Sequence, residues 1–110
     1  MIVPETPEFR AAARAHSRPD DIALEVGCSY GEATAVLVER GCRAIVGVDN
    51  SLECLRHVGE TLLPAGGRLR LQLLDCLRYP GQLSALVAAT APSLLLLDIG
   101  EKLPTPPWLT

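Results

Sequence analysis

Ala-Leu-Glu-Val-Gly-Cys-Ser-Tyr-Gly-Glu-Ala-Thr, residues 23–34, is the stretch that decides the fold of this chain. An apolar run with one acid, Glu25, enters a loop with glycines at Gly27 and Gly31, and a helical pattern begins directly after it. This order indicates a strand, a tight turn and a helix. Glycine serves where the backbone needs positive φ or a close approach, so the two glycines favour a ligand lying against the loop. An ordinary strand-to-helix connection is the alternative.

Apolar runs and helical patterns alternate along the rest of the chain. The predicted strands are Ile22 to Val26, Arg43 to Asp49, Leu69 to Leu74 and Ser93 to Ile99. The predicted helices cover Thr6 to His16, Glu32 to Arg40, a segment with Asn50 as its N-cap, and a segment opened by Pro80. Strands that alternate with helices of this length predict the α/β class, with a Rossmann-like parallel sheet and helices on both faces.

Length and composition limit the classes of protein. The chain has 110 residues, 48% of them hydrophobic and 21% charged, which is typical of one globular domain. The net charge is −3, and no basic cluster suggests a nucleic-acid-binding patch. The four cysteines, Cys28, Cys42, Cys54 and Cys76, lie far apart, so we expect reduced thiols in place of a zinc site or a disulfide framework.

The first twenty residues and the apolar runs bear on location. Residues 1–20 lack the apolar core of a secretory signal, and no run approaches the roughly 20 apolar residues of a membrane-spanning helix. We therefore expect a soluble chain with no membrane partner. The cytoplasm is the default location, and targeting to an organelle stays open.

Acidic residues recur where the predicted strands end. Asp49 and Asp98 lie at the ends of two later strands, Asp75 directly follows the third, and Glu25 lies within the first. The carboxyl ends of parallel strands meet at one rim, where open α/β sheets bind ligands, so these acids should gather there. A carboxylate inside an apolar strand has to be paired or hydrogen-bonded, which makes Glu25 harder to explain as a surface residue.

The spacing of Asp49 indicates a nucleoside ligand. Asp49 follows Gly27 by 22 residues, close to the distance of about 20 at which an acid accepts hydrogen bonds from ribose hydroxyls. A carboxylate suits vicinal hydroxyls because each of its oxygens can accept one bond. NAD would need G-x-G-x-x-G, but Ser29 and Glu32 stand at the second and third glycine positions. A dinucleotide is therefore disfavoured.

These residues resemble class I S-adenosylmethionine-dependent methyltransferases. The first motif of that family, an acid followed by G-x-G-x-G, is similar to residues 25–31, with Ser29 in place of the middle glycine. Residues 47–51, 74–76 and 96–100 are similar to the second, third and fourth motifs, and the resemblance covers about Pro7 to Gly100. It implies four strands in the order 3-2-1-4, with strands 5 to 7 of the family's seven-stranded sheet missing.

The resemblance implies roles around the glycine loop. The loop from Gly27 to Gly31, with Ser29 and Tyr30 in it, would pack beside the methionine part of S-adenosylmethionine. Glu25 would position the loop or the amino group of the cofactor. Tyr30 would form a lid on the cofactor or pack on a helix. Ser29 tolerates positive φ less readily than the glycine that it replaces.

The resemblance also implies roles for the residues after the later strands. Asp49 would hold the ribose hydroxyls, with Asn50 or Ser51 beside the adenosine. Asp75 would accept from the adenine amino group, and the Cys76 amide would face the ring edge. Asp98 would lie nearest the methionine amine and the transferred methyl. From the residues alone, Asp75 capping a turn and Asp98 solvating a loop are the alternatives.

The expected function is that of an S-adenosylmethionine-dependent methyltransferase with an unknown acceptor and an unknown catalytic base. We expect a partial cofactor-binding domain over residues 1–103 and a proline-rich tail over 104–110. A chain without strands 5 to 7 would be truncated or fragmentary, and the open edge of strand 94–97 would allow self-association. A metal site is not predicted. The alternatives are a non-catalytic module that binds the cofactor or a partner and, more weakly, a fragment of an NAD-binding oxidoreductase.

Overall fold

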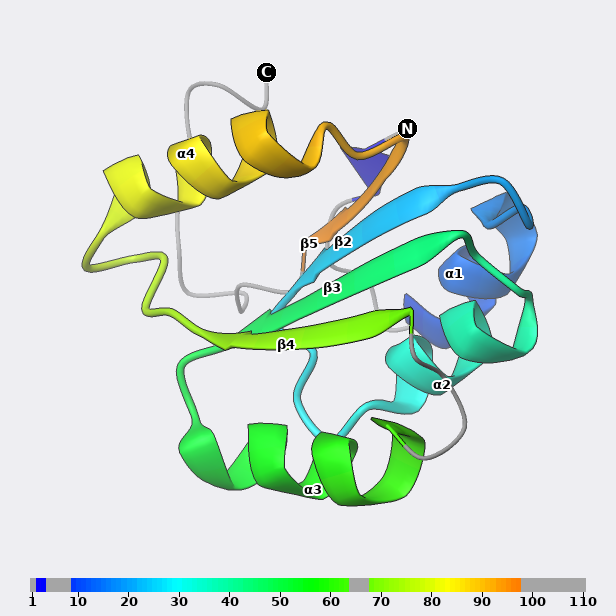
Figure 1. Cartoon of the computed structure of the whole chain (residues 1–110), viewed down its shortest axis with the longest axis horizontal. Coiled ribbons are helices and arrows are strands. Elements are labelled where there is room, and N and C mark those ends of the chain that lie inside the picture. Colours follow the sequence, from blue (N-terminus) through cyan, green and yellow to red (C-terminus); the bar gives the residue numbers. More distant parts are fainter. Residues whose placement is uncertain (1, 4–8, 64–67, 98–110) are drawn as a thin grey trace.

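A computed structural model describes residues 2–3, 9–63 and 68–97, and the structural statements below concern these residues. They form a parallel sheet flanked by helices (Figure 1). In chain order the elements are β1 (Ile2–Val3), α1 (Phe9–His16), β2 (Ile22–Val26), α2 (Glu32–Glu39), β3 (Ala44–Asp49), α3 (Leu52–Leu62), β4 (Leu69–Leu73), α4 (Pro80–Thr90) and β5 (Leu94–Leu97).

The sheet has the order β1-β5-β2-β3-β4, and its neighbouring strands are all parallel. The four predicted strands are β2, β3, β4 and β5, and they lie in the predicted order 3-2-1-4. The prediction of an open edge on the strand 94–97 is wrong in part, because β1 pairs Ile2 with Leu95 and Val3 with Leu96. A two-residue strand carries no periodic pattern, and β1 exists only through its pairing with a distant strand.

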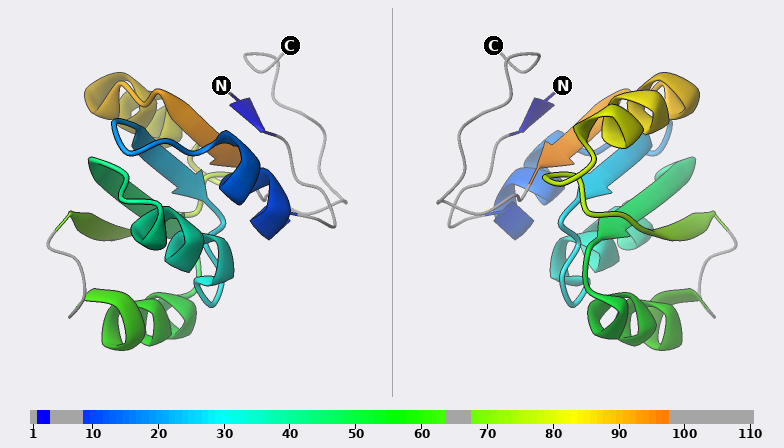
Figure 2. Two further views of the ribbon diagram at one scale, coloured as in Figure 1. Left: turned by 90° about the vertical axis from the view of Figure 1, so that its right-hand side faces the viewer. Right: turned by 90° about the vertical axis from the view of Figure 1, so that its left-hand side faces the viewer.

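Helices cover both faces of the sheet, as predicted, but unequally (Figure 2). Three helices, α1, α2 and α3, enclose one apolar cluster with the sheet, around Leu37 and Ile45. On the other face α4 encloses a second cluster, around Leu24 and Leu95. Burying one such side chain fully contributes about 1.5–3 kcal/mol, so the two clusters hold the layers together.

The start of α3 differs from its prediction. We expected Asn50 to be the N-cap, but the helix begins at Leu52 and its N-cap is Ser51. The Ser51 hydroxyl oxygen accepts a hydrogen bond from the Cys54 amide at 3.2 Å. Both residue types cap helices well, so the sequence alone did not distinguish them. Asn50 is thereby left at the sheet rim.

Some predictions lie outside the described residues. These are the helix start at Thr6 and Pro7, Asp98 with the end of the fourth motif, and the tail 104–110. In the part of the chain that the structure describes, none of the helices has both the length and the apolar character needed to cross a bilayer.

Candidate functional site

A pocket of about 150 Å³ lies at the carboxyl ends of β2, β3 and β4. Five residues singled out in the sequence meet there: Gly27, Asp49, Asn50, Asp75 and Cys76. The apolar part of the lining, Val26, Val48, Leu74 and Leu77, was missed. Val26 and Val48 stand at or next to the ends of their strands and face the α4 side of the sheet, so the alternation of side chains within the strands was the signal that could have found them.

Asp49 connects the glycine loop to α3. One carboxylate oxygen accepts from the Ser29 amide at 2.9 Å, and the other accepts from the Ser51 amide, also at 2.9 Å. Each carboxylate oxygen has two lone-pair sites, so these bonds leave capacity for further donors. Asp49 is therefore held in place by the backbone before any ligand binds.

The loop between β2 and α2 is shaped by left-handed backbone conformations. Gly27 has φ 83° and Gly31 has φ 88°, and the non-glycine Ser29 has φ 50°. The amides of Gly27 and Cys28 both donate to the Val48 carbonyl, at 2.7 and 3.0 Å. Ser29 thus adopts the conformation that a glycine would take more readily, and its hydrogen bond to Asp49 offsets part of the strain.

Glu25 lies beneath this loop and outside the pocket lining. Its side chain is 1% exposed, and Thr34 of α2 donates a hydroxyl hydrogen bond to Glu25 Oε1 at 2.5 Å. The expectation that this buried carboxylate is hydrogen-bonded is confirmed. Glu25 ties β2 to α2 and thereby fixes both ends of the glycine loop.

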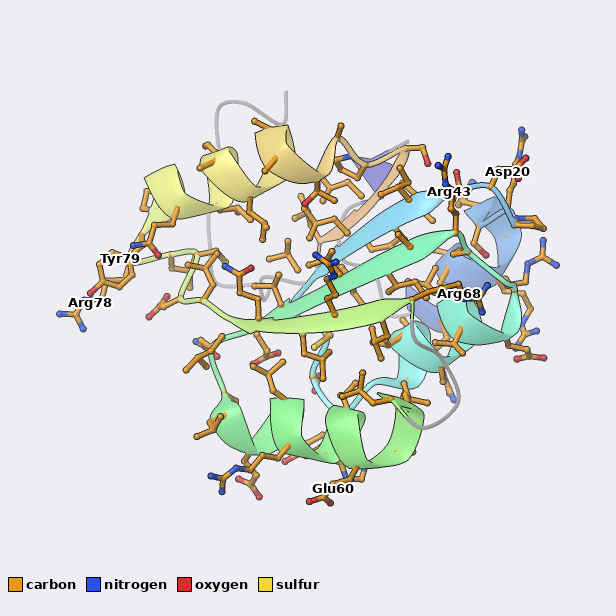
Figure 3. All side chains as sticks on the ribbon, in the orientation of Figure 1. Asp20, Arg43, Glu60, Arg68, Arg78 and Tyr79 are labelled. Atoms are coloured by element: carbon orange, nitrogen blue, oxygen red, sulfur yellow. The ribbon has the colours of Figure 1, made fainter. Side chains whose placement is uncertain are left out.

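Asp75 both caps a turn and lines the pocket. Its Oδ1 accepts from the amides of Leu77 and Arg78, at 3.2 and 3.1 Å, and its carbonyl accepts from the Tyr79 amide at 2.9 Å. Asp75 therefore caps a turn, which was the alternative role considered for it from the sequence. Figure 3 shows Arg78 and Tyr79 projecting beyond this rim.

Tyr30 leans on α3 and does not line the pocket. Its side chain is 53% exposed, and its ring meets the His57 ring edge-on at 5.5 Å between centroids. The nearby Cys54 thiol and Glu53 carboxylate raise the pKa of Tyr30 above its ordinary value. Of the two predicted places for this ring, packing on a helix is the one observed.

The cysteines at the rim are neutral thiols. Burial, with the charges of Glu25 and Asp49, raises the pKa of Cys28 from 9.0 to about 12. Burial likewise raises the pKa of Cys76. All four cysteines are free. A nucleophilic cysteine needs a thiolate, so these two groups are suited to packing and hydrogen bonding.

Comparison with known proteins identifies the fold. No family model matches the sequence, and no curated protein is similar to it in sequence. Among solved structures, YjhP from E. coli matches with a TM-score of 0.52 at 19% identity, covering 66% of this chain and 31% of that one. The 23S rRNA methyltransferase ErmE matches with a TM-score of 0.52 at 23% identity, covering 66% of this chain and 30% of that one.

The chain therefore has the fold of class I S-adenosylmethionine-dependent methyltransferases. Identities this low establish the fold alone. The chain spans less than a third of the length of either matched structure.

Proposed function

We propose that this chain binds S-adenosylmethionine at the carboxyl rim and forms the cofactor-binding part of a methyltransferase. The observation that carries the proposal is the meeting of Asp49, Asp75 and the Gly27 loop around one pocket. These residues come from three successive strand ends, and their order matches the motifs of the family. The methyl acceptor and the catalytic base stay unidentified.

The pocket suits the adenosine end of the cofactor. The carboxylate of Asp49 would accept from the ribose hydroxyls, and that of Asp75 from the adenine amino group. Asn50 and the Cys76 amide would lie beside them, with Val26, Val48 and Leu77 against the ring. At about 150 Å³ the pocket is smaller than the roughly 300–1,000 Å³ of sites that enclose a whole drug-sized ligand. The methionine end would therefore follow the loop from Gly27 to Gly31.

Charge favours S-adenosylmethionine over a dinucleotide. The cofactor supplies an activated methyl group on a positively charged sulfonium, whereas NAD carries a pyrophosphate. Glu25 and Asp49 lie at the loop, and Glu32 is in the first turn of α2, where a pyrophosphate would bind. Glu32 is paired with Arg10 at 3.5 Å and Glu25 is buried, so the Asp49 carboxylate at the pocket is the main charge that would attract a cation and repel a phosphate group.

Asp75→Asn tests the proposal with little change to the fold. The asparagine side-chain oxygen can keep the two bonds to the amides of Leu77 and Arg78, while its amino group replaces the other oxygen. A donor would then face the adenine amino group. We expect S-adenosylhomocysteine to bind about tenfold more weakly in titration calorimetry, a loss of about 1.4 kcal/mol.

Asp20→Asn is the matched control, because it makes the same change of charge at the opposite end of the sheet (Figure 3). It should bind S-adenosylhomocysteine like the unmodified chain. Equal affinities for all three proteins would contradict the role of Asp75. Tighter binding of NAD than of S-adenosylhomocysteine would favour the oxidoreductase alternative.

A further inference from the structure

A second hollow lies at the amino ends of β3 and β4, on the face of the sheet that carries α4. Its volume is about 700 Å³. It exists because α4 lies along the β5 side of this face and leaves the β4 side open (Figures 1 and 2). We call it the arginine groove, and its described lining is Ile22, Arg43, Ala44, Ile45, Val46, Arg68, Arg70, Leu71, Gln72, Leu86, Ala89 and Thr90.

Three arginines from separate parts of the sequence meet in this groove. Arg43 and Arg68 precede β3 and β4 and lie at their amino ends (Figure 3), and Arg70 lies within β4. All three are exposed. The ion pairs among the described residues involve Arg10 and Arg14, so none of the three arginines has a described carboxylate within pairing distance.

Asp20 and Asp21 precede β2 at this end of the sheet and lie outside the described groove lining. Asp20 is exposed and takes part in none of the described ion pairs, whereas Asp21 has other partners. The Asp21 carboxylate accepts from the Arg18 amide at 2.7 Å and from the Ser93 hydroxyl at 2.8 Å. The C-terminal end of α4, which reaches the groove at Thr90, adds a partial negative charge of about −0.5. Three guanidinium groups outweigh that charge, so the groove attracts anions.

The chemistry of the lining narrows the ligand. Guanidinium groups bind phosphate through paired, charge-assisted hydrogen bonds. The floor and wall also offer apolar side chains, including Val46 and Leu86, and no described lining residue is aromatic. Single-stranded nucleic acids are held largely by stacking on aromatic rings, so the groove is better suited to a small molecule. Its volume falls within the usual range for small-molecule sites.

We propose that the arginine groove binds a small organic phosphate. The guanidinium groups of Arg43, Arg68 and Arg70 contact the phosphate, and the organic part lies against Val46 and Leu86. The described linings of the groove and of the pocket at Asp49 share no residue, and Arg43 precedes Asp49 by six residues along β3, about 20 Å at 3.3 Å per residue. The groove is therefore a site distinct from the proposed cofactor pocket and independent of it.

Naphthyl phosphate, a phosphate ester with an apolar body, is the probe for this site. Titrated into the full chain at low salt, it should bind saturably at one site. Arg70→Ala should weaken binding about tenfold or more, and Arg70→Lys should weaken it less, because lysine keeps the charge and loses the planar fork. Arg56→Ala, an exposed arginine of α3 outside the groove, is the matched control and should leave binding unchanged.

Several results would overturn the proposal. One is the absence of saturable binding by a chain whose thermal unfolding is cooperative. Another is equal weakening by Arg70→Ala and Arg56→Ala, which would indicate a non-specific charge effect. A short RNA that binds with sensitivity to Arg70→Ala, while naphthyl phosphate does not bind, would assign the groove to a polymer instead. Arg70 is exposed, so its replacement should leave the fold intact.

Discussion

The two ends of β3 and β4 carry charges of opposite sign that are held in different ways. At the carboxyl ends, Asp49 and Asp75 accept hydrogen bonds from backbone amides, which fix the position of each carboxylate. At the amino ends, Arg43, Arg68 and Arg70 are exposed and contact no described carboxylate. A pre-organised rim can select a ligand by shape, whereas long free side chains select mainly by charge. The same two strands thus present two kinds of recognition surface.

The largest effect on ligand binding should come from Asp49→Ala, which removes the centre of the ordered rim. We expect the affinity for S-adenosylhomocysteine to fall by at least about a hundredfold, or about 2.7 kcal/mol. The free energy of unfolding should also fall, by about 2 kcal/mol, because the amides of Ser29 and Ser51 lose their acceptor. Titration calorimetry and urea denaturation measure the two effects. Full affinity in the variant would contradict a ligand role for this carboxylate.

The next effect compares a glycine at each end of the sheet. Gly31 and Gly41 both have positive φ, 88° and 76°. A Cβ at Gly31 would lie 2.9 Å from Val58 Cγ2, whereas a Cβ at Gly41 would lie 4.0 Å from an Arg68 nitrogen. We expect Gly41→Ala to cost about 1–2 kcal/mol of stability from backbone strain. Gly31→Ala should cost about 1–2 kcal/mol more from overpacking.

Thermal and urea denaturation of the two glycine variants measure this difference. Since both carry the same backbone strain, the difference between them isolates the contact with Val58. Equal losses would show that α3 moves away from the loop without cost. That result would contradict a rigid carboxyl rim.

A smaller effect depends on pH. The pKa of Cys28 is raised to about 12, so the folded thiol keeps its proton where the unfolded thiol, with a pKa near 9, ionises. Stability therefore falls as pH rises from about 9 to 12. Between pH 8 and 10 this thiol should lower the free energy of unfolding by about 1.4 kcal/mol. Urea denaturation of Cys28→Ala, which lacks the thiol, should not show this part of the loss.

Cys42 is the matching thiol at the amino end. Burial and Asp21 raise its pKa, but Arg68 and Arg40 oppose the shift. Cys42→Ala should therefore remove a smaller part of the alkaline loss than Cys28→Ala. If Cys42→Ala removes as much of the alkaline loss in stability as Cys28→Ala, or more, the neighbouring charges do not determine the pKa values of the two thiols.

The smallest effect should come from Ser93→Ala at the amino end. The Ser93 hydroxyl accepts from the Ile22 amide at 2.9 Å and donates to Asp21 at 2.8 Å. Its removal should cost about 1 kcal/mol of stability. Binding of S-adenosylhomocysteine in calorimetry should stay within about twofold, because distant sites contribute independently. A large loss of affinity would show that the two ends are coupled.

Much of the fold could be predicted because it depends on local patterns. The apolar runs at residues 22–26 and 44–49 are buried strands, and the polar alternation of 69–73 gives the edge strand β4. The choice between Asn50 and Ser51 as N-cap depends on which of these adjacent side chains accepts from the Cys54 amide, and a shift of one residue in the helix start decides it. The strand β1 depends on pairing with a segment more than ninety residues away, which no local pattern contains.

The candidate site was predictable where an acid follows a strand. Asp49 and Asp75 fall at such positions, and topology alone brings them together. Their hydrogen bonds to backbone amides were harder to foresee, because they depend on the loop conformation at Ser29. The arginine groove was not predictable from the sequence, since Arg43 lies 25 residues before Arg68 and the open half of the α4 face appears only in three dimensions.

The pairing of β1 with β5 has a consequence for the order of folding. Once β5 has paired with β2, β1 still has to close the loop of residues 4–21, and it gains only two residue pairs for that entropy. The strands β2, β3 and β4 can assemble earlier, and β1 should join last and detach first. The outer side of β5 is then a place where a longer strand could displace β1 without unfolding the rest of the sheet.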